Sequence, residues 1–343
     1  MPRRVLVVTH PGNPVAMAAL SELRRELEEY GFEVTVDRAP SDAPMAFGDA
    51  AEAELNLQAV AGYEFVVVLG GDGTILRAAE LTHGTDIPIL GINLGHVGFL
   101  AEAEREDIRD AVRRLGTGDF TVEERTVAAV KVERPDDDEP LTGWALNEAT
   151  IEKASRQRLI EVGIEVDSRP LSSFGCDGII VSTATGSTAH AFSAGGPVMW
   201  PDVAGVLLVP LAAHALFARP LVVGPTSEFR ITLLKRSPMA AYLVCDGRRS
   251  VELPLGSVVT VRLGDHPLKF ARLTPASFTD RLVSKLSLPI VGWREAAEGH
   301  TASDMAAHSD DDTAESADGG SADVRLADSA SAGAKRADVK STW

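Results

Sequence analysis

The sequence predicts an N-terminal α/β domain with a parallel sheet, a C-terminal all-β domain resembling a sandwich, and a disordered C-terminal tail. Three observations predict this architecture. Continuous apolar runs alternate with helical periodicity in the first third of the chain, which is typical of a parallel sheet covered on both faces. Short apolar runs separated by turn residues follow from about residue 120. Large apolar side chains almost vanish after residue 294.

The α/β pattern occupies residues 1–120. Apolar runs predict strands at residues 4–9, 32–36, 64–69 and 87–92. Leu20, Leu23 and Leu27 recur at helical spacing, and residues 108–115 predict another helix. Strands therefore alternate with helices, as in a parallel sheet.

The β pattern occupies residues 121–274. Short apolar runs predict strands at residues 127–132, 144–151, 159–166, 178–182, 221–223, 229–234, 242–245 and 258–263. Turn residues separate them, for example at 135–138 and 167–170. An amphipathic helix is predicted at residues 278–286.

The C-terminal segment, residues 295–343, is acidic. It holds 11 acidic and 4 basic residues, so 7 of the 17 excess negative charges of the chain lie there. Its apolar surface is too small to offset the entropy of ordering, which predicts a disordered, solubilising tail. An acidic interaction segment is the alternative.

Composition excludes several classes of partner. The formal net charge is −17 over 343 residues, and basic residues occur only as isolated pairs, which disfavours nucleic acid. No stretch approaches the roughly 20 apolar residues of a membrane span, and the N-terminus is a predicted strand rather than a signal peptide. Cys176 and Cys245 lack metal or disulfide spacing, which predicts buried thiols in a reducing cytoplasm. We therefore expect a cytoplasmic protein with no nucleic-acid or membrane partner and no protein metal cluster.

The first chemical motif is Gly70-Gly71-Asp72-Gly73-Thr74, directly after the strand at 64–69 and before a helical run. Glycines let the backbone turn sharply and bring its N–H groups close to a ligand, and a helix N-terminus favours phosphate. The spacing is neither that of a Walker A loop nor that of the dinucleotide fingerprint.

Asp72 is the informative residue of this motif, because a carboxylate among phosphate-facing amides repels phosphate. Either it holds Mg²⁺, or it accepts the proton of an attacking hydroxyl during phosphoryl transfer. The structural alternative is that Asp72 only caps the following helix.

Two further motifs lie in the β part. At residues 178–197 a predicted strand runs into a loop in which Thr185, Ser187 and Thr188 offer donors to ribose or phosphate oxygens. The pair Asn147-Glu148 lies inside a predicted strand, where a polar pair can also face solvent.

Together and in this order, the three motifs resemble the NAD kinase family, in particular its actinobacterial branch. The resemblance runs from about residue 64 to 294 and includes residues 91–101, 174–178, 214–220, 245–248 and 278–293. The GGDGT element alone is shared with diacylglycerol and sphingoid-base kinases, but the hydroxyl loop is not.

The resemblance implies roles for particular residues. Residues 1–120 would bind the phosphate donor and 121–274 would bind NAD, while 275–294 would pack back on the first domain. Asp72 would be the general base for the 2′-hydroxyl of the adenosine ribose. The donor loop would comprise Gly70, Gly71, Gly73 and Thr74. Contacts to NAD would come from Asp72, Gly73, Arg77, Asn147, Glu148, Arg158, Asp177, Thr188, Ala189, His190, Ala191, Phe192 and Ser193. Arg156 competes with Arg158 for its role.

The implied reaction makes NADP from NAD with ATP, inorganic polyphosphate or both as donor, and a divalent metal, Mg²⁺, as cofactor. A homodimer or homotetramer is expected by resemblance. Two departures stand out: His190 replaces the usual Tyr, and Thr9-His10-Pro11-Gly12-Asn13 replaces the usual His-Thr-Gly-Arg. A lipid kinase with the GGDGT element and an NAD-binding sensor without turnover are the alternative functions.

Overall fold

A computed structural model describes residues 3–10, 12–37, 45–95, 98–216, 218–274 and 278–290. Residues Met1–Leu288 form one compact unit. The tail predicted at 295–343 lies outside the described residues. Within the described part, no helix is both long and apolar enough to cross a membrane.

The first lobe is built on a mainly parallel sheet with the strand order β2-β1-β4-β5-β20-β7, and β6 pairs with β5. Strand β1 is parallel to β2 and β4, β5 is parallel to β4 and β20, and only β7 is antiparallel to its neighbour β20. The strands are β1 (Arg3–Thr9), β2 (Phe32–Asp37), β4 (Phe65–Leu69), β5 (Ile89–Asn93), β6 (Ala103–Glu104), β7 (Thr121–Arg125) and β20 (Leu268–Arg272).

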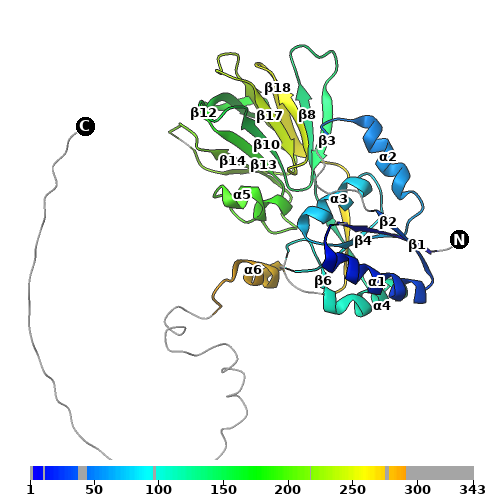
Figure 1. The fold of residues 1–343 in the computed structure, drawn as a ribbon. Helices are drawn as coiled ribbons and strands as arrows, with labels where there is room; N and C mark the ends of the chain where they lie inside the picture. The colour runs from blue at the N-terminus through cyan, green and yellow to red at the C-terminus, as the bar shows by residue number, and fades with distance from the viewer. Residues whose placement is uncertain are drawn as a thin grey trace, which may run out of the picture. The chain divides into compact units, whose positions relative to one another are not determined.

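Helices cover both faces of this sheet, as Figure 1 shows. The helices are α1 (Pro14–Glu29), α2 (Ala50–Val60), α3 (Asp72–Thr82) and α4 (Ile108–Thr117), with a 3₁₀ turn at Arg105–Asp107. Leu23 of α1 and Val112 of α4 pack in one apolar core, whereas Ile75 of α3 packs in another. All five residues of β4 are buried because both of its faces are covered.

The second lobe is a sandwich of two sheets. One has the order β15-β14-β13-β10-β17-β18-β3 and the other β12-β11-β16-β19-β8-β9. Their inward side chains, such as Val181, Phe229 and Leu243, form one shared core. The strands are β3 (Met45–Ala46), β8 (Ala128–Glu133), β9 (Leu141–Ala145), β10 (Glu148–Lys153), β11 (Ile160–Val166), β12 (Arg169–Cys176), β13 (Gly178–Ser182), β14 (Val206–Leu211), β15 (Leu221–Val223), β16 (Phe229–Leu233), β17 (Ala241–Cys245), β18 (Arg249–Leu253) and β19 (Val258–Leu263).

Three strands join the lobes. β3 comes from the N-terminal part of the chain but pairs with β18 at the edge of a sandwich sheet. β7 and β20 fall within the expected second domain, residues 121–274, yet both belong to the first sheet. The boundary in space therefore differs from a single cut in the sequence, because β20 returns the chain to the first sheet through the pair Phe270↔Ile89.

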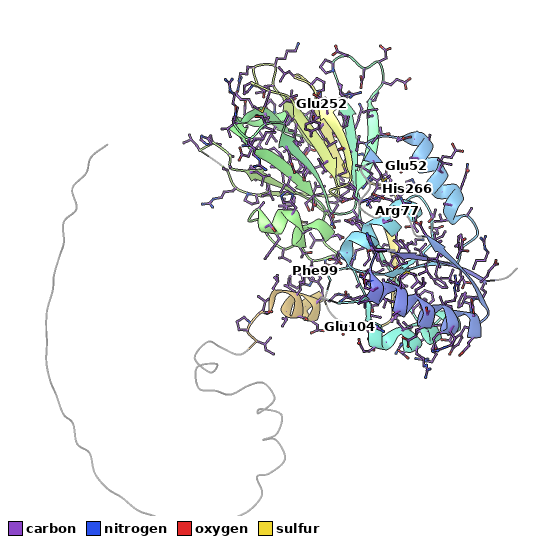
Figure 2. All side chains as sticks on the ribbon, in the orientation of Figure 1. Glu52, Arg77, Phe99, Glu104, Glu252 and His266 are labelled. Carbon is purple, nitrogen blue, oxygen red and sulfur yellow. The ribbon has the colours of Figure 1, made fainter. Side chains whose placement is uncertain are left out.

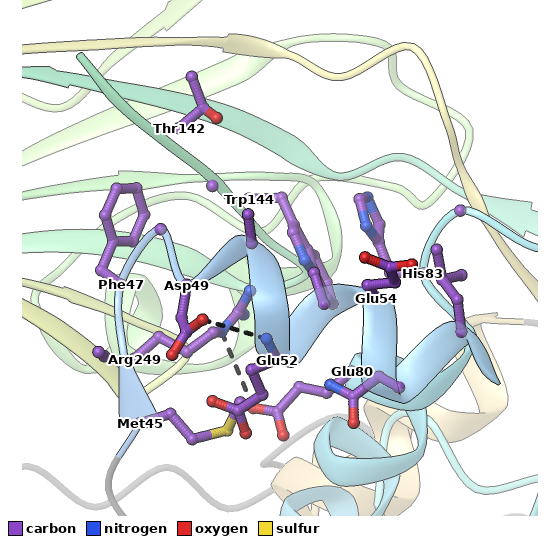
Figure 3. Close-up of a pocket in the computed structure, with 18 residues that line it drawn as sticks. Met45, Phe47, Asp49, Glu52, Glu54, Glu80, His83, Thr142, Trp144 and Arg249 are labelled. Atoms are coloured by element: carbon purple, nitrogen blue, oxygen red, sulfur yellow. Dashed lines mark hydrogen bonds and ion pairs between the residues drawn. The ribbon is translucent and has the colours of Figure 1, made fainter. Parts of the chain in front are cut away.

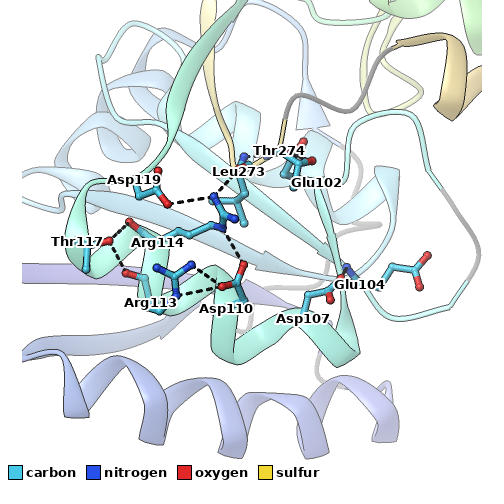
Figure 4. A network of polar contacts seen from close by, with 10 residues as sticks. All are labelled: Glu102, Glu104, Asp107, Asp110, Arg113, Arg114, Thr117, Asp119, Leu273 and Thr274. Carbon is cyan, nitrogen blue, oxygen red and sulfur yellow. Dashed lines mark hydrogen bonds and ion pairs between the residues drawn. The ribbon is translucent and has the colours of Figure 1, made fainter.

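The chain after β20 is fastened by Glu102. Its carboxylate accepts hydrogen bonds from the backbone N–H groups of Leu273 and Thr274, while Arg114 donates to the Leu273 carbonyl (Figure 4). Helix α6 (Phe278–Leu286) then begins, and its Arg281 lies 3.1 Å from Glu102. These contacts tie α6 to the first lobe.

Candidate active site

The GGDGT element forms the turn between β4 and α3, at the carboxyl edge of the parallel sheet. Gly71 is the N-cap of α3, and the first N–H groups of the helix have no intrahelical partner. A Cβ on Gly70 would lie 2.5 Å from Thr74 Oγ1, whereas a Cβ on Gly71 or Gly73 would have no atom of the described residues within 4 Å. The turn thus exposes backbone donors where a phosphate can approach.

The Asp72 carboxylate accepts hydrogen bonds from the backbone N–H groups of Phe99 and Leu100, both at 3.4 Å. Asp72 is the first residue of α3, and its N-cap makes no side-chain cap bond. The alternative that Asp72 only caps the helix is therefore wrong. Its carboxylate instead faces the segment that follows β5.

Gly98 shapes this carboxylate site, and motif reasoning did not single it out. A Cβ on Gly98 would lie 2.4 Å from Asp72 Oδ1, so any larger residue would displace the carboxylate. The sequence does contain an indication of this site. Gly98 follows the buried strand β5, which is the parallel neighbour of β4, so it lies at the same edge of the sheet as the glycine turn.

Asn147 lies in the break between β9 and β10, which the sequence predicted as one continuous strand. Its carbonyl accepts hydrogen bonds from Thr183 N and Ser182 Oγ. A Cβ on Gly186 would lie 2.1 Å from the same carbonyl, so only glycine fits there. The hydroxyl loop is therefore held directly against the Asn147 backbone.

Glu148 is 8% exposed and therefore does not lie on a solvated face of the strand, whereas Asn147 is partly exposed. Burial and the nearby Asp246 charge raise the pKa of Glu148 to about 8, and the His190 backbone amide opposes this shift. Glu148 Oε2 has no hydrogen-bond partner among the described residues. A buried carboxyl oxygen without a partner is suited to a hydrogen bond with a ligand hydroxyl.

His190, whose backbone amide hydrogen-bonds Glu148, also lines a cavity of about 480 Å³ whose walls include Lys153, Arg156 and Asp177. Lys153 Nζ makes a short ion pair with Asp177. Arg156 and Arg158 are both exposed, and of the two only Arg156 lines this cavity. Lys153, which sequence reasoning missed, also lines it.

The hydroxyl loop folds as a 3₁₀ turn, η2 (Thr185–Thr188), followed by the one-turn helix α5 (His190–Ser193). Ser187 is fully buried, and its hydroxyl contacts Ala184 O and the Met199 backbone. The expectation that Ser187 offers a donor to a ligand is wrong, because the hydroxyl is used inside the loop. Ala191 is buried, whereas Phe192 is 39% exposed.

Arg77 lies one helical turn after Gly73 on α3, where the two lobes meet (Figure 2). Its guanidinium lies 3.7 Å from Asp37 and 3.5 Å from Glu80. Two carboxylates therefore share this charge before any ligand is considered.

The donor set limits how a metal would be held. Among the described residues, no group of three or more His, Cys, Asp or Glu side chains has the arrangement of a metal site. Mg²⁺ is commonly bound through one or two carboxylates together with substrate phosphates and water. Asp72 beside the open glycine turn fits that mode, and a cage made only by the protein does not.

Comparison with known proteins gives the family. The model of the ATP-NAD kinase N-terminal domain matches residues 5–120, and that of the C-terminal domain matches residues 146–273. An NAD kinase of Leifsonia xyli subsp. xyli is 50% identical over 85% of this chain and 97% of its own. One of Bifidobacterium longum subsp. infantis is 48% identical over 89% of this chain and 88% of its own. The chain belongs to the NAD kinase family. The family, enzyme class and fold class expected from the sequence are confirmed.

Solved NAD kinase structures share the fold. An NAD kinase from Archaeoglobus fulgidus in complex with ATP has a TM-score of 0.63 at 28% identity, over 83% of this chain and 98% of that one. The yeast NADH kinase complexed with NADH has a TM-score of 0.73 over 85% and 90% of the chains, and its 22% identity indicates the common fold. The family assignment also favours a nucleotide over a lipid substrate.

Proposed function

We propose that this protein transfers a phosphoryl group to the 2′-hydroxyl of the adenosine ribose of NAD and so makes NADP. The observation that carries the proposal is the position of the Asp72 carboxylate, at the first turn of α3 and held by two backbone N–H groups from the neighbouring loop. Curated relatives named NAD kinase support it.

In the proposed step, the ribose oxygen forms a bond to the terminal phosphorus of the donor while the bond from that phosphorus to its bridging oxygen breaks. The hydroxyl proton passes to Asp72, and the leaving phosphate keeps the bridging electron pair. Backbone N–H groups of the glycine turn stabilise the charge on the transferred group. Mg²⁺, when bound, would neutralise the donor phosphates, with Asp72 as the available carboxylate near them.

Binding of NAD is assigned to the second lobe. The unpaired Oε2 of buried Glu148 offers a hydrogen bond to a ribose hydroxyl, with Asn147 beside it in the chain. The cavity with Asp177, His190 and Arg156 would take the remainder of the dinucleotide. His190 can stack on a base, although its ring is smaller than that of the usual Tyr.

The donor is tested directly by incubating the purified chain with NAD, Mg²⁺ and either ATP or polyphosphate. NADP formation is read by a coupled dehydrogenase. We expect activity with ATP, because a solved relative at 28% identity is in complex with ATP. If calorimetry shows that NAD binds but neither donor yields NADP, the proposal is contradicted. That result would favour an NAD-binding sensor without turnover. A cytoplasmic location, the Mg²⁺ requirement and a homodimer or homotetramer stay predictions from the resemblance.

A further inference from the structure

Asp246 lies in the tight turn between β17 and β18, in the left-handed conformation with φ of 52°. The residue is 6% exposed, and its carboxylate does not face solvent. It accepts hydrogen bonds from three consecutive backbone N–H groups, those of Leu146 at 2.9 Å, Asn147 at 2.7 Å and Glu148 at 3.3 Å. One side chain therefore fixes the break between β9 and β10.

The hydrogen bonds of Asp246 replace a sheet ladder. β9 ends at Ala145 and β10 begins at Glu148, so the backbone between them leaves regular pairing. Asp246 N also donates to the Glu148 carbonyl at 3.0 Å. Because buried amides need acceptors, the conformation of the segment that carries Asn147 and Glu148 depends on this carboxylate.

The same carboxylate is linked to helix α3. Arg249 Nη2 lies 2.5 Å from Asp246 Oδ2, and its guanidinium stacks over the Trp144 ring at 4.1 Å. Arg248 Nε donates to Glu80 Oε1 at 2.8 Å, and Arg249 Nε lies 3.8 Å from the same oxygen. Figure 3 shows Arg249 and Trp144 near Glu80. We call Asp246, Arg248, Arg249 and Glu80 the interlobe ion network.

The interlobe ion network is buried. The side chains of Asp246, Arg248, Arg249 and Glu80 are 2%, 9%, 8% and 3% exposed, and Arg77 also lies 3.5 Å from Glu80. Removing one member of such a set leaves a buried charge without its partner, so the arrangement resists small displacements. Glu80 belongs to α3, which begins at Asp72.

Building on the proposed function, we propose that Asp246 is a positioning residue for phosphoryl transfer. Its carboxylate fixes the backbone of Asn147 and Glu148, and through Arg248, Arg249 and Glu80 it keeps that segment in register with the helix that carries Asp72. Asp246 touches neither substrate. It fixes the position of the segment with Asn147 and Glu148 relative to the Asp72 carboxylate.

The test compares Asp246→Asn with Asp167→Asn in the full chain. Asp167 is a matched control: it also lies in a hairpin turn with φ of 51°, and its carboxylate accepts from Glu228 N and Ser227 Oγ. Asparagine tolerates the left-handed conformation at both positions. The two variants therefore differ in which backbone amides lose a carboxylate acceptor, those of residues 146–148 or that of Glu228. Amide hydrogen exchange, thermal unfolding and steady-state kinetics are measured for both.

For Asp246→Asn we expect the amides of residues 146–148 to exchange about 10-fold faster or more, because a charged acceptor is lost. The KM for NAD should rise by about 10-fold while the KM for the donor changes by no more than about 2-fold. Asp167→Asn should match the wild type in the exchange of the amides of residues 146–148 and in the KM for NAD. Unchanged exchange at residues 146–148, or an unchanged KM for NAD in a folded Asp246→Asn protein, would overturn the proposal.

Glu80→Gln tests the link to α3 if Asp246→Asn does not fold. It leaves the three amide bonds in place, so protection at residues 146–148 should persist while kcat falls about 5-fold or more. A kcat equal to that of the wild type would overturn the link. The proposed function and the role of Asp246 can fail separately. If the wild-type chain forms no NADP, the proposed function is contradicted. The hydrogen-exchange measurement does not depend on turnover, so it tests the role of Asp246 in either case.

Discussion

Single carboxylates in this protein differ in what holds them. Asp72 accepts from two backbone N–H groups at the edge of an open turn, whereas Asp246 is enclosed by three amides and a guanidinium. Glu148 is buried with one oxygen unpaired. We propose that Asp72 accepts the ribose proton, that Asp246 holds the backbone, and that Glu148 hydrogen-bonds a ligand hydroxyl.

The base assignment predicts the behaviour of Asp72→Asn. The amide keeps the shape of the side chain but cannot accept the ribose proton, so kcat should fall by about 10²-fold or more. The Kd for NAD, measured by calorimetry, should stay within about 3-fold of wild type. A variant that retains most of its kcat would refute the role of Asp72 as base.

His83 predicts a pH dependence of stability. Its ring stacks on Trp144 at 4.1 Å, and burial, followed by the nearby Arg249 charge, lowers the pKa of His83 from 6.5 to about 4. Between these values the unfolded chain binds a proton that the folded chain does not. The stabilisation is therefore complete above pH 6.5 and is lost as the pH falls through 4, by about 3 kcal/mol for this group.

Chemical denaturation at pH 4 to 7 measures this effect. His83→Phe keeps an aromatic ring against Trp144 but does not titrate, so its unfolding free energy should fall less steeply on acidification than that of the wild type. Equal slopes for the two proteins would show that His83 does not contribute.

At the scale of elements, the site is made from the ends of strands. β4 and β5 are parallel neighbours, so the glycine turn after β4 and the loop after β5 emerge at one edge of the sheet. In the sandwich, the break after β9 and the end of β13 meet through Ser182 and Thr183. Each half of the site thus depends on which strands are neighbours.

The loop after β5 predicts the effect of Gly98→Ala. The added Cβ would lie 2.4 Å from Asp72 Oδ1, so the carboxylate must rotate away from the Phe99 and Leu100 amides. We expect kcat to fall about 10-fold or more with little change in the melting temperature. Gly95→Ala is the matched control, because no atom of the described residues lies within 4 Å of its added Cβ. Equal kcat values for the two variants would contradict this account of Gly98.

At the scale of the whole molecule, the lobes are joined by strands that complete the sheet of the other lobe and by the ion pairs of the interlobe ion network. β3 extends a sandwich sheet, and β7 and β20 complete the first sheet. The described residues of the candidate site all lie within Met1–Leu288. The tail contributes 7 of the 17 excess negative charges and supplies no predicted site residue.

Removal of residues 295–343 is therefore expected to leave kcat/KM for NAD within about 2-fold of the full chain, since no group that acts on substrate is lost. The coupled assay on both proteins at equal concentration measures this. A large loss of activity would show that the tail has a role beyond solubility.

Local pattern predicted much of the fold and the glycine turn. Apolar runs of β-branched residues locate β1, β4 and β13 because burial on both faces leaves no polar position in a strand. The same reasoning placed a turn at residues 167–170, but only Asp167 and Ser168 turn, with φ of 51° and 62°, and β12 starts at Arg169. The periodicity missed helix α2 and several strands, among them β7, β12, β14, β18 and β20.

The sequence by itself located many of the strands and helices and the glycine turn after β4, since these depend on residues within a few positions of one another. Tertiary structure alone decided that Asp246 holds the amides of residues 146–148, that Gly98 confines Asp72, and that Arg156 rather than Arg158 lines the cavity. Such contacts join residues as much as 100 positions apart. They exist only once the register of β10, β13 and β17 is set, and register follows from packing of whole sheets rather than from any local pattern.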